Sequence, residues 1–315
     1  MSLEWIFRLA IIAVLFATVH VLSRLLKDLG LGENIQTFFV LMALYNPFQF
    51  RFYLANPYMI SDLVFQCGLL CAILAIKREN YLGTFFLILL AFLARQTLLI
   101  TLPFLVILMW KEWKNISAKT KLPYISILLV FLALEYQMLG HVATLFASSA
   151  NYNTRHVTAL LEWMLSAFDP RMFILFVGRG LLPLIPALVL FFFCRKNYRK
   201  GLLYFFMAFF IFLQPLLGGP DLTGDNFTRL SALSNLIFII AIAQMIPAQF
   251  VLSLRELGVA WLIFLTGSFH HLYSILPVSR PVFSVFYLFS CVALIICCAM
   301  KTRASPAVLP SKRAI

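Results

Sequence analysis

Two ionisable residues lie where long apolar stretches begin or break, and their positions suggest a polar site. Asp62 follows Asn56-Pro57-Tyr58 at the start of the apolar stretch 59–76, whereas Arg95 and Gln96 interrupt the middle of 81–110. An ionisable group within such a stretch is expected to face a partner or water and to serve a function. Simpler roles stay open, because Asp62 can cap a helix start and Arg95 can reach a nearby polar surface.

A second group of polar residues lies in the segment 218–229, which reads GGPDLTGDNFTR. Gly and Pro permit a tight turn here, so we expect an exposed loop that precedes the next helix. Arg229 carries a planar fork of donors that suits a phosphate group, and Asn226 lies beside it in sequence. The alternative is a plain connector in which Asp225 pairs with Arg229.

Histidines and cysteines give a weaker signal. His270 and His271 lie at the end of the apolar stretch 250–275, where His271 could bind phosphate or metal. Cys67 and Cys71 lie one helical turn apart with no histidine or carboxylate cluster beside them, so they are expected to pack as small apolar residues. No P-loop, GxGxxG, HExxH or GxSxG motif occurs.

The composition indicates that the elements around these residues lie in a membrane. Of 315 residues, 63% are hydrophobic and 12% are charged, whereas soluble domains are about half apolar and a quarter charged. The formal net charge of +13 could favour nucleic acid, but the basic residues fall between long apolar stretches. We therefore expect membrane lipids, and no nucleic acid, as partners.

Length then predicts the spans, since a helix needs about 20 apolar residues to cross a bilayer. Spans are expected near 4–25, 34–46, 59–76, 123–145, 172–194, 201–217, 229–246, 250–275 and 281–300. The stretch 81–110 is too long for one span, and a lone Arg95 at its centre would be costly. It predicts two short helices that meet at Arg95–Gln96 and return to the same side. The fold class is an all-α membrane bundle of about 9–11 helices that includes this re-entrant pair.

Basic residues orient this bundle. Seventeen of the 25 Lys and Arg residues fall in linkers that share one face when 81–110 is re-entrant: 24–27, 77–78, 111–121, 195–200, Arg255 and 301–313. The positive-inside rule makes that face cytoplasmic. We expect one transmembrane domain over 1–300, a basic cytoplasmic tail over 301–315, and a multi-pass location in a bacterial inner or plasma membrane.

The arrangement resembles the C-type glycosyltransferase superfamily, whose members take sugars from polyprenyl-phosphate donors at the outer membrane face. The matching features are the Tyr45-Asn46-Pro47 break, Pro57-Tyr58 with Asp62 opening a span, the helix pair around Ala91–Leu105, and the outer segment Gly224–Leu230. The resemblance covers most of 1–245 and is one of pattern.

The resemblance implies roles for the polar residues. Asp62 and Asp225 would be the catalytic carboxylates, because the acceptor oxygen must lose a proton as it attacks. Arg229 would hold the donor phosphate, with Arg95, Asn226 and His271 completing the substrate site. A polyprenyl-phosphate lipid would be the donor, and a divalent metal stays open as a cofactor.

The chain departs from the pattern at its beginning, because the usual first span and acidic outer loop are missing. This leaves an N-terminally shortened or inactive glycosyltransferase-like protein as one reading. A transporter or flippase for a lipid-linked or anionic solute is the alternative, because broken helices with polar residues at depth are typical of transporters. A non-enzymatic subunit with a membrane-protein partner is the third.

The charge pattern predicts an outside N-terminus and an inside C-terminus. Reporter fusions after Lys121, Lys200 and Lys301 should report cytoplasm, because the basic linkers stay inside. Fusions near Asn151 and Thr223 should report the opposite face, and a cytoplasmic signal at Asn151 would overturn the topology.

Overall fold

The computed structural model describes residues 3–46, 49–95, 97–146, 170–194, 197–223, 227–247 and 250–268, together with 282, 285, 288–295 and 297. Within these residues every regular element is a helix, so the prediction of an all-α fold is confirmed for the described chain. In chain order the elements are α1 (Leu3–Asp28), α2 (Glu33–Leu44), α3 (Phe50–Ala55), the 3-10 turn η1 (Pro57–Met59), α4 (Ile60–Lys77), α5 (Tyr81–Ala94), α6 (Leu98–Glu112), α7 (Ala118–Phe146), α9 (Pro170–Leu181), the 3-10 turn η2 (Leu182–Leu184), α10 (Ile185–Cys194), α11 (Tyr198–Thr223), α12 (Phe227–Ala232), α13 (Asn235–Met245) and α14 (Leu254–Ser268).

Among the described residues, three helical segments are long and apolar enough to cross a membrane. They are Glu4–Asp28 with 25 residues, Ile60–Lys77 with 18, and Phe227–Met245 with 19. At a rise of about 1.5 Å per residue, each approaches the ~30 Å thickness of a hydrocarbon core. The larger number of spans expected from the sequence stays a prediction.

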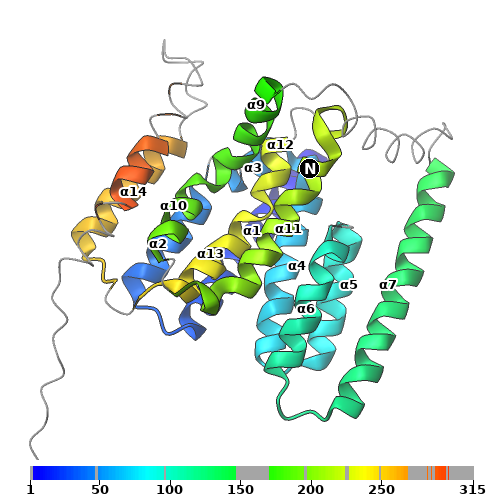
Figure 1. Ribbon diagram of the computed structural model, residues 1–315. Helices are drawn as coiled ribbons and strands as arrows, with labels where there is room; N and C mark the ends of the chain where they lie inside the picture. The colour runs from blue at the N-terminus through cyan, green and yellow to red at the C-terminus, as the bar shows by residue number, and fades with distance from the viewer. Residues whose placement is uncertain are drawn as a thin grey trace, which may run out of the picture.

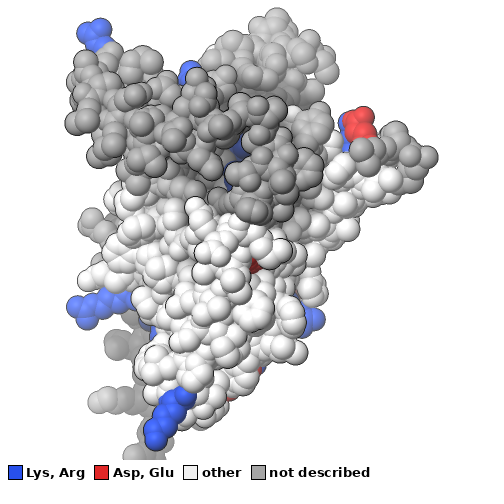
Figure 2. Space-filling view, turned by 90° about the vertical axis from the view of Figure 1, so that its right-hand side faces the viewer, with Lys and Arg blue, Asp and Glu red and all other residues white. Residues whose placement is uncertain are grey.

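Large apolar side chains cover much of the outer surface of the helices. Along α1 and α7 they include Trp5, Ile6, Leu9, Phe16, Leu122, Val130, Leu134 and Met138, all more than half exposed. In the space-filling view the described surface is nearly free of charged side chains, which lie mostly at its margins (Figure 2). Water-soluble monomers rarely expose apolar patches of this kind, so this surface suits contact with lipid.

The centre of the fold is a group of helices that bury one another. Helix α4 packs against α1 and α5, and α11 packs against α13. Helix α6 contacts both α4 and α11, so the N-terminal half around α4 and the C-terminal half around α11 meet through these three helices. Helices α7 and α14 stand on opposite sides of this group (Figure 1). The described parts of α4 and α13 carry the most continuous core, with Asp62, Gln66 and Asn235 as its buried polar members.

Helices α5 and α6 form a hairpin whose turn lies at one end of α4. Asn80 begins α5 by accepting a hydrogen bond from the Gly83 amide at 2.9 Å. At the open end of the hairpin, opposite the turn, the Tyr81 ring contacts Trp113, directly after α6, with ring centroids 4.8 Å apart. Arg95, between the helices, has an extended backbone with φ −156° and ψ 130°. The chain therefore breaks at Arg95–Thr97 and turns back; whether the bilayer surrounds this pair as a re-entrant element stays a prediction.

Two segments differ from the expectation. The loop expected over 218–228 is shorter, because α11 continues through Gly218, Gly219 and Pro220 to Thr223. A helix satisfies its own backbone groups, and here this outweighs the poor helix propensity of Gly and Pro. The span expected over 172–194 is not one helix, because η2 interrupts it at Pro183. The expected helix over 281–300 and the tail 301–315 lie largely or wholly outside the described residues.

Candidate functional site: an aspartate between two arginines

Asp62 forms ion pairs with two arginines that are far apart in the sequence. Its Oδ1 lies 2.8 Å from Nη1 of Arg95, and its Oδ2 lies 3.3 Å from Nε of Arg229. The Asp62 side chain is 2% exposed, that of Arg229 11% and that of Arg95 23%. A buried carboxylate is tolerated only when it is paired, so the three side chains define one charged cluster with a net positive charge.

Each member of this cluster reaches it from a different break in the helices. Asp62 is the third residue of α4, which begins after the Pro57–Met59 turn. Arg95 occupies the break between α5 and α6. Arg229 belongs to the short helix α12, directly before α13. A residue at a break can turn toward a neighbouring helix end, which is why three distant segments meet here.

Aromatic packing holds α12 in place. The Phe227 ring stacks on Phe176 of α9 with centroids 4.1 Å apart and an interplanar angle of 12°, and it also contacts Phe212 of α11. Gly180 lies so close that a Cβ there would stand 2.3 Å from the Phe227 ring. Because Phe227 is fixed on three sides, Arg229 two residues later has a defined position. Its Nη1 also donates to the sulfur of Met59 in η1.

A chain of buried amides joins the same segments deeper in the core. Gln49 Nε2 donates to Gln66 Oε1 of α4 at 2.9 Å, and Asn235 Nδ2 of α13 donates to Gln49 Oε1 at 2.9 Å. Asn46 Nδ2 donates to the Pro183 carbonyl in η2 at 2.8 Å. Hydrogen bonds between buried amides are strongly favoured over unsatisfied groups, so they fix α4 and α13 relative to each other. Asp62 and Arg229 are thereby held at adjacent helix ends.

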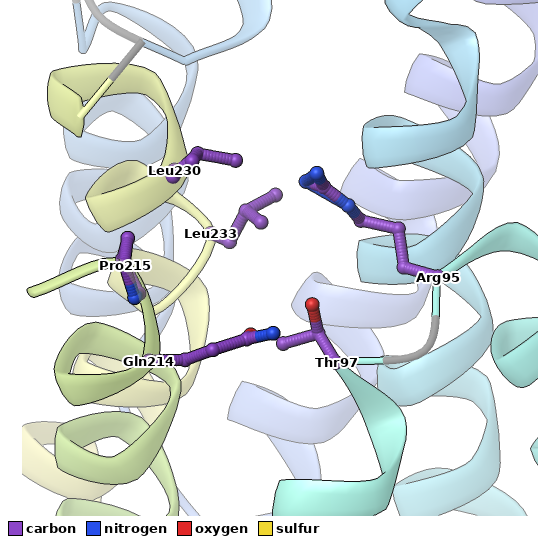
Figure 3. Close-up of a pocket in the computed structure, with 6 residues that line it drawn as sticks. All are labelled: Arg95, Thr97, Gln214, Pro215, Leu230 and Leu233. Carbon is purple, nitrogen blue, oxygen red and sulfur yellow. The ribbon is translucent and has the colours of Figure 1, made fainter. Parts of the chain in front are cut away.

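A cavity of about 150 Å³ opens beside Arg95. Its lining consists of Arg95, Thr97, Gln214, Pro215, Leu230 and Leu233. The close-up shows the Arg95 side chain extending toward Leu230 and Leu233, while Thr97 and Gln214 point toward each other below it (Figure 3). One cation, one hydroxyl and one amide therefore line a small space with an apolar wall, which suits an anionic group joined to an apolar chain.

The geometry assigns different work to the carboxylate and the arginines. Both oxygens of Asp62 lie against a guanidinium group, so this carboxylate holds the two cations together and fixes their direction. A guanidinium has five N–H donors, and Arg95 directs only Nη1 toward Asp62. Arg95 can therefore donate to an anionic ligand in the cavity while it remains paired with Asp62.

Three of the residues singled out in the sequence meet here: Asp62, Arg95 and Arg229. Asp225, Asn226 and His271 lie outside the described residues, so their expected roles stay predictions. Three buried amides, those of Gln49, Gln66 and Asn235, were not expected from the sequence. The sequence did contain an indication of Gln66, because an amide within an apolar span such as 59–76 must find a buried partner.

Among the described residues, no group of three or more His, Cys, Asp or Glu side chains could hold a metal ion. No protein-family model, curated protein or solved structure matches the chain. In the part of the chain that the structure describes, the protein is all-helical, with three apolar helical segments long enough to span a membrane and a buried Arg–Asp–Arg cluster.

Replacing Asp62 tests this cluster. Asp62→Asn removes the carboxylate that both guanidinium groups contact and leaves two cations side by side with little water. We expect the free energy of unfolding to fall by about 3–5 kcal/mol, the usual cost of breaking a buried ion pair. Arg229→Gln should cost more than Arg95→Gln, because Arg229 is more deeply buried. Thermal unfolding in one detergent would measure all three.

The matched control is the exposed pair between Glu4 and Arg8 on α1, at 2.6 Å. Glu4→Gln should lower stability by roughly 1 kcal/mol or less, because water screens an exposed pair. If Asp62→Asn and Glu4→Gln lower the free energy of unfolding equally, the buried cluster stabilises the fold no more than an exposed ion pair does.

Proposed function

We propose that this protein is a multi-span membrane protein that binds the phosphate of a polyprenyl-linked sugar beside Arg95 and acts as a glycosyltransferase on it. The observation that carries the proposal is the Arg95 guanidinium, which lines a cavity while Asp62 holds it in place. Guanidinium groups bind phosphate oxygens through paired hydrogen bonds, and a carboxylate partner keeps such a group in a fixed direction.

The position of the cluster suits a lipid-linked phosphate. Asp62 is the third residue of α4, so it lies only about 3 Å along the helix axis from the start of a segment long enough to span. A lipid phosphate lies near the membrane surface while its chain stays in the hydrocarbon region. The apolar wall of Leu230 and Leu233 can contact the first carbons of that chain.

The charge of the cluster also matches the charge change in glycosyl transfer. A sugar linked to polyprenyl phosphate is a phosphodiester with one negative charge. When an acceptor hydroxyl attacks the anomeric carbon, the bond from that carbon to the phosphate oxygen breaks. The leaving polyprenyl phosphate is then a monoester with a charge of about −1.5 to −2 at neutral pH. Fixed cations therefore stabilise the leaving group more than the donor, which lowers the barrier.

The reaction also needs a base for the proton of the acceptor hydroxyl. Asp62 is engaged by both arginines, so in this proposal it positions them. Asp225 then takes the proton, since it lies four residues before Arg229 in the chain. This step assigns the two predicted carboxylates separate roles.

Transport of a lipid-linked or anionic solute is the second candidate. It is favoured by the interruptions of the helices at Arg95–Thr97, at η2 and at Leu233–Ser234, since transporters bind substrates at broken helices. Both functions require the same phosphate contact. They differ in outcome, because a transporter moves its substrate between leaflets unchanged, whereas the enzyme separates sugar from phosphate.

Binding of a short polyprenyl phosphate to the purified protein tests the shared step. Arg95→Gln should weaken binding by about one to two decades, because a charge-assisted contact contributes roughly 1.5–3 kcal/mol. Arg229→Ala should weaken binding as well. Arg229→Lys should weaken it less than Arg229→Ala, because lysine keeps the positive charge and loses only the planar fork of donors. Calorimetric or fluorescence titration in detergent would give the dissociation constants.

Two controls separate binding from general damage. Arg8→Gln removes an exposed arginine of α1 and should leave the affinity unchanged. The uncharged polyprenol should bind wild type and Arg95→Gln equally, since it lacks the phosphate. Wild-type affinity for the phosphate in both Arg95→Gln and Arg229→Ala, measured below the unfolding temperature of each variant, would end the proposal.

A further inference from the structure

A second and larger cavity lies at the opposite end of the central helices. Its volume is about 430 Å³, and it is formed where α4, α6 and α13 end and α11 begins. Three lysines line it: Lys77 is the last residue of α4, Lys111 lies in the last turn of α6, and Lys200 lies in the first turn of α11. With Glu112 as the one carboxylate in its described lining, the cavity has a net positive charge. We refer to it as the lysine cavity.

Helix dipoles explain two of these lysines but not the third. A cation in the last turn of a helix is favourable, which accounts for Lys77 and Lys111 on their own helices. Lys200 is in the first turn of α11, where the dipole disfavours a positive charge. The dipole therefore does not account for Lys200, which the basic segment 195–200 brings to the same cavity as Lys77 and Lys111.

A buried hydroxyl gives an independent indication. Tyr204 of α11 lines the lysine cavity and is 3% exposed. Its Oη lies beside the Gln244 side chain without a hydrogen bond of good geometry. A hydroxyl group is both a donor and an acceptor, so this one can also bond to a ligand or water. Gln244 of α13, also in the lining, adds an amide on the same side.

We propose that the lysine cavity binds a phosphate headgroup, with Lys77, Lys111 and Lys200 supplying charge and Tyr204 and Gln244 supplying hydrogen bonds. The phosphate can belong to an anionic lipid or to a soluble phosphate ester. Leu29, Leu31 and Leu203 give the cavity an apolar part that can contact the glycerol end of a lipid. Its volume falls within the ~300–1,000 Å³ range of ligand sites.

This site is separate from the cluster around Asp62 and does not rest on the proposed function. It lies at the end of the molecule that the basic linkers predict to be cytoplasmic. Anionic lipids are concentrated in cytoplasmic leaflets, and basic pockets between membrane helices recognise their headgroups. An anionic lipid bound there would join α4, α6 and α11, the helices through which the two halves of the protein meet.

The test compares two triple variants of the full chain in detergent. Lys77→Gln/Lys111→Gln/Lys200→Gln removes the charges of the cavity. Its control, Lys114→Gln/Lys119→Gln/Arg255→Gln, removes the same charge from exposed residues that do not line it. Native mass spectrometry would measure the retention of phosphatidylglycerol and phosphatidylcholine, and titration would measure the affinity for glycerol 3-phosphate.

We expect phosphatidylglycerol to bind wild type and the control alike, and the cavity variant about tenfold or more weakly. Tyr204→Phe should lower the affinity for phosphatidylglycerol about two- to tenfold, the effect of one neutral hydrogen bond. If the triple variant does not fold, Tyr204→Phe and the single change Lys111→Gln, at an exposed residue, provide the same test. Weaker binding of glycerol 3-phosphate in the same variants would assign the site to the headgroup itself. An unchanged affinity there, with loss of phosphatidylglycerol, would assign it to intact lipid.

Equal phosphatidylglycerol binding in the cavity variant and its control would overturn the proposal, as would equal retention of phosphatidylcholine and phosphatidylglycerol by wild type. The loss of phosphatidylglycerol binding caused by the cavity variant should also occur in an Arg95→Gln background, because Arg95 lies at the other end of the helices. Failure of the polyprenyl-phosphate site and failure of the lysine cavity would therefore be distinguished by different variants.

Discussion

The ion pairs from Asp62 to Arg95 and Arg229 bring together three segments that lie far apart in the chain. In a core with little water none of the three charges is stable alone, so the start of α4, the α5–α6 break and the start of the α12–α13 segment must meet. Other contacts hold the same segments in place. Phe227 fixes α12 against α9 and α11, and the Gln49 amide connects α4 to α13.

The same constraint gives the cluster its chemical character. Two arginines and one aspartate leave an excess positive charge, and Arg95 presents it to a small cavity beside leucines. A site of this kind favours a phosphate on an apolar chain over a neutral lipid. In the glycosyl transfer that we propose, such a site would also favour the more highly charged product over the donor. The lysine cavity at the other end repeats the preference for anions with a different donor group, because lysines hold phosphate as point charges.

The sequence predicted some parts of this arrangement well. Arg95 in the middle of 81–110 predicted the break between α5 and α6, because an arginine there is costly in a continuous span. Asp62 and Arg229 were singled out separately, but their contact was not predicted, since it depends on how α4 and α12 pack. The alternative pairing of Arg229 with Asp225 stays a prediction, because Asp225 lies outside the described residues. Gln49 was missed because a short segment between helices shows no periodicity, and α11 was predicted too short because Gly218-Gly219-Pro220 is typical of a turn.

The central claim is that Arg95, held by Asp62, binds a lipid-linked phosphate. The most direct test is a structure of the protein in a lipid nanodisc with an added polyprenyl phosphate. The account predicts a phosphate within hydrogen-bonding distance, about 3 Å, of the Arg95 guanidinium, with Asp62 still against both arginines and the lipid chain beside Leu230 and Leu233. A bound polyprenyl phosphate with its phosphate elsewhere, and the cavity beside Arg95 filled only by water, would contradict it.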